Sequence, residues 1–131
     1  MVGFQKSESF DKAYNDMPKK PGVYVIALKN ERICRLEGES DILYIGSTRG
    51  KGGLRNKFSH YRNPGRSQNT NIKINNFIIK SEPDIAIFWK IIENEDPRKE
   101  EERLLNEYFN EHGELPPLND SNPRGMNKNL D

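Results

Sequence analysis

The segments GVYVIALK at residues 22–29 and ILYIGS at residues 42–47 contain the tripeptides Gly-Val-Tyr and Tyr-Ile-Gly. β-Branched and aromatic residues dominate both segments, which predicts two strands, the second antiparallel to the first. Each tripeptide places a tyrosine, Tyr24 or Tyr44, beside a glycine that lets another backbone approach closely. Two phenol groups at the ends of neighbouring strands could face one cleft, and packing of the sheet is the alternative for each tyrosine.

Three later segments have helical patterns. Leu54, Phe58 and Tyr61 recur at helical spacing, which predicts a short helix that ends before Asn63-Pro64-Gly65. Residues 72–79 form a second predicted helix, with Thr70 or Asn71 as its N-cap. The last helix begins at Asp96-Pro97, runs to about His112 and closes at Gly113.

A third strand is predicted at residues 85–92, whose nearly continuous apolar sequence IAIFWKII is typical of a central position. The order β-β-α-α-β-α then gives an α/β (α+β) fold, with a small three-stranded, mostly antiparallel sheet flanked by helices. We expect one domain at residues 21–119, after a polar segment or short helix at residues 1–20. Residues 120–131 form a polar C-terminal tail.

Charge is unevenly distributed, although the formal net charge is only +1. No acid occurs between Asp41 and Glu82, and acids dominate residues 93–114. The basic residues of the middle region are Arg49, Lys51, Arg55, Lys57, Arg62, Arg66, Lys73 and Lys80. This pattern fits a polyanion site beside a metal-binding carboxylate, and ordinary surface charge is the alternative. The strongly basic composition that would itself support nucleic-acid binding is absent.

Cys34 is the single cysteine, so neither an internal disulfide nor a cysteine-rich zinc site can form. No apolar stretch approaches the length needed to span a membrane. The N-terminus lacks the apolar core of a signal peptide. We therefore expect a cytoplasmic protein without membrane contact.

The segment LRNKFSHY at residues 54–61 follows the second tripeptide closely. Together with the two tripeptides it resembles the GIY-YIG nuclease family, which is named after them. The corresponding helix of that family reads roughly Leu-x-x-Arg-apolar-x-x-(His or Tyr). Leu54, Phe58 and Tyr61 match this pattern, and Lys57 occupies the arginine position.

The replacement of arginine by Lys57 changes the chemistry at a position that the family uses for catalysis. Arginine presents a planar fork that binds two phosphate oxygens, whereas lysine is a point charge. Lys57 precedes Tyr61 by one helical turn on the same face, so it could still neutralise charge on a phosphate. Arg55 lies roughly 200° around the helix from Lys57 and is a second candidate for this role.

On the last helix, Glu101 precedes Leu104 and Leu105 at the spacing typical of the family's metal-binding glutamate. Glu102 has Asn106 at its +4 position, which makes it the weaker alternative. Glu101 also shares the apolar face of the helix, where a cation would remove the cost of burying a carboxylate. The alternative is a solvated first turn, where acids are favoured by the helix dipole.

The resemblance extends over residues 21–119 and includes the end of that range. Family members often end in a proline followed shortly by an asparagine that helps to hold the site, and Asn119 matches. Gly46 and Tyr61 have supporting roles by the same resemblance. The connection between the two tyrosines is longer here than in compact members.

The resemblance implies an endonuclease that hydrolyses DNA phosphodiester bonds with one Mg²⁺ or Mn²⁺ bound by Glu101. Tyr24 or Tyr44 would position or deprotonate the attacking water, while Lys57, assisted by Arg55, would stabilise the transition state. Tyrosine has a pKa near 10 in its free form, so a base role requires a nearby cation. We expect contacts with the DNA backbone from Arg49, Lys51, Arg62, Arg66 and Lys73.

Two other functions remain open from the sequence. The first is a catalytically impaired nucleic-acid-binding module that keeps the fold, which Lys57 in the arginine position favours. The second is a protein-interaction domain without nucleic acid, which the near-zero net charge favours.

Overall fold

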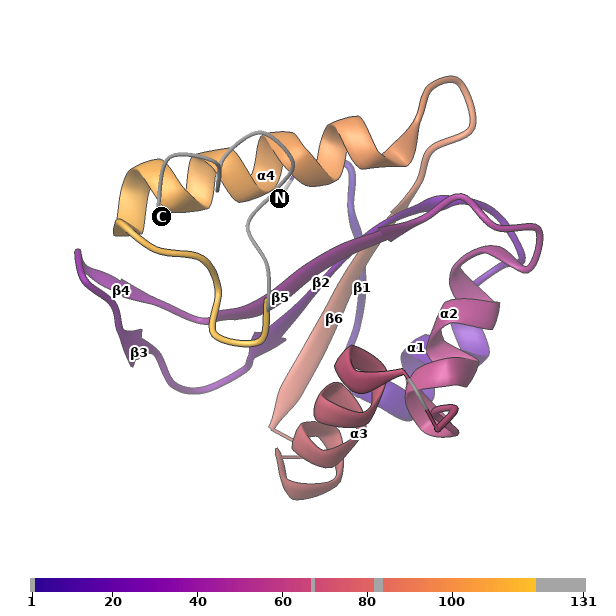
Figure 1. Cartoon of the computed structure of the whole chain (residues 1–131), viewed down its shortest axis with the longest axis horizontal. Helices are drawn as coiled ribbons and strands as arrows, with labels where there is room; N and C mark the ends of the chain where they lie inside the picture. The colour runs from indigo at the N-terminus through magenta and orange to yellow at the C-terminus, as the bar shows by residue number, and fades with distance from the viewer. Residues whose placement is uncertain (1, 67, 82–83, 120–131) are drawn as a thin grey trace.

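The computed structural model describes residues 2–66, 68–81 and 84–119, so the predicted tail at residues 120–131 lies outside the described residues. Figure 1 shows the helices and strands along the chain. Their bounds are β1 Gln5–Ser7, α1 Phe10–Asp16, β2 Gly22–Leu28, β3 Ile33–Cys34, β4 Glu39–Ser40, β5 Ile42–Thr48, α2 Gly53–Arg62, α3 Asn69–Ser81, β6 Ile85–Ile91 and α4 Pro97–His112.

The main sheet has four strands in the order β1-β6-β2-β5, and every neighbouring pair is antiparallel. The prediction of three strands was therefore wrong, because β1 adds a fourth at the edge. β1 is the polar tripeptide Gln-Lys-Ser, and it lacks the apolar run by which a strand is recognised. Its pairing with β6 and a 3.2 Å hydrogen bond from Trp89 Nε1 to Ser7 Oγ hold it in place. The inner position predicted for β6 is confirmed.

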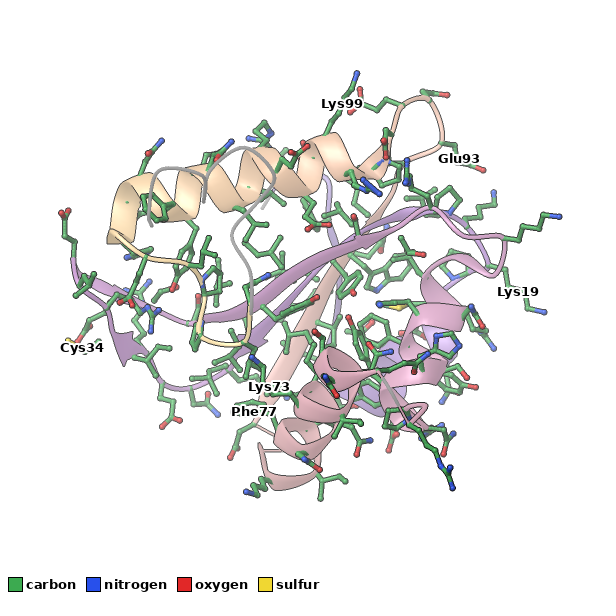
Figure 2. All side chains as sticks on the ribbon, in the orientation of Figure 1. Lys19, Cys34, Lys73, Phe77, Glu93 and Lys99 are labelled. Atoms are coloured by element: carbon green, nitrogen blue, oxygen red, sulfur yellow. The ribbon has the colours of Figure 1, made fainter. Side chains whose placement is uncertain are left out.

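Residues 30–41, between the two tyrosine-bearing strands, contain a small ribbon formed by β3 and β4. This ribbon contacts the end of α4, where the backbone N–H of Glu37 donates to the carbonyl of His112 at 3.0 Å. Arg35 forms an ion pair with Glu114 at 3.2 Å in the same region. The exposed Cys34 lies in this ribbon, at the opposite end of the molecule from Lys19 (Figure 2).

The helices agree closely with the periodicity of the sequence. Ser9 caps α1 through a 3.1 Å hydrogen bond from the Lys12 N–H. Asp96 caps α4 in the same way, and Gly113 closes that helix with φ of 75°. α3 begins earlier than predicted, at Asn69, and the predicted N-cap residues lie inside the helix. No helix in the described part of the chain is both long and apolar enough to cross a membrane.

The sheet lies between two unequal layers of helix (Figure 1). α4 covers one face, and α1, α2 and α3 cover the other. Side chains of β2 alternate between the two cores: Tyr24 and Ile26 pack with α1, α2 and α3, whereas Val25 packs with Leu105 of α4. All seven residues of β2 are buried as a result. The protein is thus a small α+β domain, and the tyrosine of the first tripeptide lies on the three-helix face.

Candidate active site

The structure brings Tyr24, Tyr44 and Tyr61 into one cluster, although they come from β2, β5 and α2. The ring centroids of Tyr24 lie 6.2 Å from Tyr44 and 6.0 Å from Tyr61, and those of Tyr44 and Tyr61 are 6.4 Å apart. The hydroxyls of Tyr24 and Tyr61 share a hydrogen bond inside the core. Tyr44 is half-buried, so it is the member of the cluster closest to solvent.

Gly46 makes room for this cluster. Tyr24 and Gly46 are direct partners across β2 and β5, and Tyr44 precedes Gly46 by two residues on the same strand face. A Cβ atom on Gly46 would lie 2.6 Å from Tyr24 Oη and 2.7 Å from Tyr44 Cε2, well inside contact distance. Position 46 therefore requires glycine, because the phenol of Tyr24 lies where a side chain would begin.

Burial controls the acidity of the two inner tyrosines. Both Tyr24 and Tyr61 are 0% exposed, and loss of solvation raises the pKa of each well above its usual value. The neighbouring Tyr44 raises the pKa of Tyr24 further. A buried phenol of this kind keeps its proton and acts as a hydrogen-bonding group, so Tyr24 is a poor general base here.

Lys57 lies beside the tyrosine cluster on α2, with its ammonium 5.3 Å from the ring centroid of Tyr61. Burial lowers the pKa of this lysine, and the negative charge of Glu101 opposes that shift. One face of the lysine borders an open hollow of about 500 Å³, which is also lined by His60 and by residues 68–71. A cation with restricted solvation, next to a polar hollow, suits contact with an anionic substrate.

Glu101 reaches the site from α4, on the opposite face of the sheet. β5 is the edge strand, so only this strand separates α4 from the tyrosine side. Burial raises the pKa of the Glu101 carboxyl, Glu102 raises it further, and a hydrogen bond from Ser47 and the charge of Lys57 oppose the shift. The hydrogen bond from Ser47 ties Glu101 to the strand that carries Tyr44, and the charge of Glu101 acts on the pKa of Lys57.

The sequence did not reveal the contact between Ser47 and Glu101. The Ser47 hydroxyl, directly after the Tyr-Ile-Gly tripeptide, donates to Glu101 Oε1. Ser47 follows Gly46 on β5, so strand alternation turns it away from the tyrosines and toward α4. The signal in the sequence was a hydroxyl one residue beyond the tripeptide, which is too common in turns to stand out.

Arg55 lies outside this group. Its Nε donates to the carbonyl of Met17 at 2.9 Å, and its Nη2 donates to the carbonyl of Asn15 at 2.8 Å. These carbonyls are at the C-terminal end of α1, where the last carbonyls of a helix need partners. Arg55 therefore ties α2 to α1, and the structure does not bring it to the tyrosines.

Asn119 binds the backbone of the second tripeptide directly. Its Oδ1 accepts from Ile45 N at 3.1 Å, and its Nδ2 donates to Ile45 O at 3.0 Å. The N–H of Leu118 also donates to the Leu43 carbonyl at 2.9 Å. The asparagine amide thus occupies the outer hydrogen-bonding groups of β5 between Tyr44 and Gly46.

The basic residues named as DNA contacts are spread around α2 and α3. Arg49 forms an ion pair with Asp96 at 3.3 Å, and Arg62 forms one with Asp11 at 2.5 Å. Lys51 and Arg66 are exposed in the loops at the two ends of α2. Lys73 is half-buried on α3, one helical turn before Phe77 (Figure 2).

Glu101 is the candidate ligand for a divalent cation at this site. Among residues 2–66, 68–81 and 84–119, no cluster of three or more His, Cys, Asp or Glu side chains could hold a metal ion. Mg²⁺ commonly keeps several waters and binds through one or two carboxylates together with substrate phosphate. A single partly buried carboxylate whose charged form is disfavoured by burial fits that mode, because a cation would favour the charged form.

The site therefore combines a phenol near solvent, a partly buried ammonium and a partly buried carboxylate, which come from β5, α2 and α4. This set can orient a water molecule, neutralise a phosphate and bind one hard cation. Comparisons of the chain with family models, with curated proteins and with solved structures give no match.

Proposed function

We propose that this protein is a metal-dependent endonuclease of the GIY-YIG type that hydrolyses DNA phosphodiester bonds. The observation that carries the proposal is the convergence of Tyr44, Lys57 and Glu101 around the Tyr24–Tyr61 pair. These residues lie far apart in the sequence and on three separate elements. Ordinary packing of a sheet gives no reason to bury part of a lysine on α2 and part of a glutamate on α4.

In the proposed mechanism Tyr44 holds the attacking water, because it is the half-buried member of the tyrosine cluster. Tyr24 and Tyr61 keep their protons and fix the position of Tyr44 from inside the core. Lys57 stabilises the charge that develops on the phosphate. Glu101 would hold one Mg²⁺ or Mn²⁺, which, when bound, polarises the phosphate and stabilises the leaving oxygen.

The substrate is assigned from the charge around the site. Lys51 and Arg66 are exposed in the loops before and after α2, and the partly buried Lys57 lies on the helix between them. Cations that neutralise phosphates are the main source of affinity for a nucleic-acid backbone. Binding to DNA should weaken steeply as the salt concentration rises.

Cleavage of supercoiled plasmid in the presence of Mg²⁺ or Mn²⁺ tests the proposal. We expect nicked or linear product from the wild-type protein and none from Glu101→Ala, with circular dichroism showing that the variant is folded. Glu111→Ala, which removes an exposed glutamate from the same helix, is the matched control and should cut normally. Full cleavage by Glu101→Ala would overturn the assignment of the metal ligand.

A non-catalytic nucleic-acid-binding module is the second candidate, and Lys57 in the arginine position is the observation that favours it. This candidate predicts salt-sensitive DNA binding by the wild-type protein without cleavage under any divalent cation. Binding and cleavage measured on the same plasmid, across a salt series, separate the two functions.

A further inference from the structure

Resting on the function proposed above, we propose that Ser47 is the positioning residue for the metal-binding carboxylate of Glu101. The observation is the hydrogen bond in which the Ser47 hydroxyl donates to Glu101 Oε1. With Oε1 held by the hydroxyl, Oε2 would be the oxygen left for a cation. This hydrogen bond joins β5 to α4, so it sets the carboxylate relative to the strand that carries Tyr44.

The placement of Ser47 explains how two faces of the sheet cooperate. Strand alternation turns Tyr44 and Gly46 toward α2 but turns Ser47 toward α4. The tripeptide and the residue after it therefore supply both halves of the site: a phenol on one face and a carboxylate anchor on the other. Thr48, the next residue, again changes face, and its Oγ1 lies 3.4 Å from the Gly50 N–H instead.

A glutamate side chain has three rotatable bonds, and a single-carboxylate cation site gives it little other support. A partner that fixes one oxygen reduces the freedom that is lost when the cation binds. Removal of such an outer partner typically weakens metal binding about 10- to 100-fold. Ser47 should therefore affect cation affinity even when DNA is absent.

The test is a titration of the DNA-free protein with Mn²⁺, in which free Mn²⁺ is followed by electron paramagnetic resonance. Ser47→Ala should bind Mn²⁺ about 10- to 100-fold more weakly than wild type. Ser47→Thr keeps the hydroxyl and should bind within about threefold of wild type. Thr48→Ala, the neighbour on the other face, is the matched control and should bind normally.

The Glu101→Gln background distinguishes positioning from a general loss of structure. There, Ser47→Ala should cause no further loss of Mn²⁺ binding, because the ligand that it positions is already absent. If Ser47→Ala fails to fold, Ser47→Cys preserves the volume with a weaker donor and should give an intermediate affinity.

Two outcomes would overturn the proposal. The first refutes only the role of Ser47, and the second also refutes the metal site. Wild-type affinity in folded Ser47→Ala, with Glu101→Gln still deficient, refutes the role of Ser47 and leaves the nuclease proposal intact. Failure of the wild-type protein to bind Mn²⁺, or normal binding by Glu101→Gln, removes the metal site and the proposed function together with it.

Discussion

Tyr24 and Tyr61 satisfy each other inside the core: their hydroxyls share one hydrogen bond, and both side chains are 0% exposed. Each hydroxyl thus has a hydrogen-bond partner at a position that is shielded from solvent. The pair links β2 to α2, and through the ring of Tyr44 it also fixes the half-buried phenol at the site.

Removing one hydroxyl of this pair should destabilise the protein. Tyr24→Phe or Tyr61→Phe removes the hydrogen bond that the two buried hydroxyls share, which typically costs about 1 kcal/mol of unfolding free energy. The double variant should lose less than the sum of the two single losses, by about 1 kcal/mol or more. Urea unfolding of all four proteins completes the cycle, with Tyr14→Phe on α1 as control; strict additivity would contradict the pairing.

Gly46→Ala should destabilise the protein, because the new methyl group would overlap Tyr24 and Tyr44. Overpacking of this kind costs about 1–3 kcal/mol. Tyr24→Phe removes one of the atoms concerned, so the double variant Gly46→Ala/Tyr24→Phe should recover part of the loss. Gly50→Ala is the control, since its added Cβ would lie an ordinary 3.8 Å from Thr48. Equal stability of the two alanine variants would refute this explanation.

Glu101→Gln should stabilise the fold while removing cation binding. Burial raises the pKa of Glu101, so the folded state holds this proton more tightly than the unfolded state. The stability that comes from the neutral carboxyl is therefore complete at pH values below the pKa that Glu101 has in the unfolded state. It is lost as the pH rises through the higher pKa of the folded state. Glutamine stays neutral, so the variant should unfold at higher urea than wild type at pH 7.

The same difference should shrink at acid pH, which supplies the control for the glutamine variant. Below about pH 4 the wild-type carboxyl is itself protonated, and the two proteins should approach equal stability. Chemical denaturation at a series of pH values measures this change directly. A pH-independent difference would show that the effect comes from packing and not from the charge of Glu101.

Lys57→Ala should lower cleavage about 100-fold or more, as expected for loss of a group that stabilises transition-state charge. Lys57→Arg should cleave at least as fast as wild type, because the guanidinium can bind two phosphate oxygens. Initial rates of plasmid nicking at saturating Mg²⁺ measure both effects. Lys51→Ala, an exposed lysine before α2, serves as control; comparable losses in Lys51→Ala and Lys57→Ala would reduce Lys57 to a general DNA contact.

Asn119→Ala should destabilise the protein by about 1–2 kcal/mol, because it leaves the Ile45 N–H and carbonyl without their side-chain partner. Asn119→Asp keeps the acceptor for the Ile45 N–H but places a second acceptor oxygen against the Ile45 carbonyl, so it should also destabilise the protein. Thermal unfolding of the two variants ranks them. An alanine variant as stable as wild type would mean that water replaces the amide without cost.

The strands and helices with strong periodicity could be predicted from the sequence, whereas β1 could not. The apolar runs of β2, β5 and β6 are buried strands, and the spacing of Leu54, Phe58 and Tyr61 gives α2. The polar tripeptide of β1 becomes a strand because it pairs with β6. The strand propensities of its three residues do not indicate that pairing.

For the site, the sequence indicated which residue types converge but not how each side chain is oriented. Arg55 and Lys57 are both basic and two residues apart, yet one donates to α1 and the other lies beside Tyr61. The Ser47–Glu101 hydrogen bond joins residues separated by 54 positions, and it depends on the packing of α4 against β5. Side-chain direction is decided by tertiary contacts that a pattern of residue types leaves open.

The amide of Asn119 also has a consequence for how the molecule meets others of its kind. β5 is an edge strand of the sheet. Free N–H and carbonyl groups on an edge strand can pair with a strand of another molecule. On β5, the Asn119 side chain bonds the N–H and carbonyl of Ile45, and the Leu118 N–H donates to the carbonyl of Leu43. The residues that hydrogen-bond the outer side of β5 thereby also block the addition of a strand from another molecule, which is a route to aggregation.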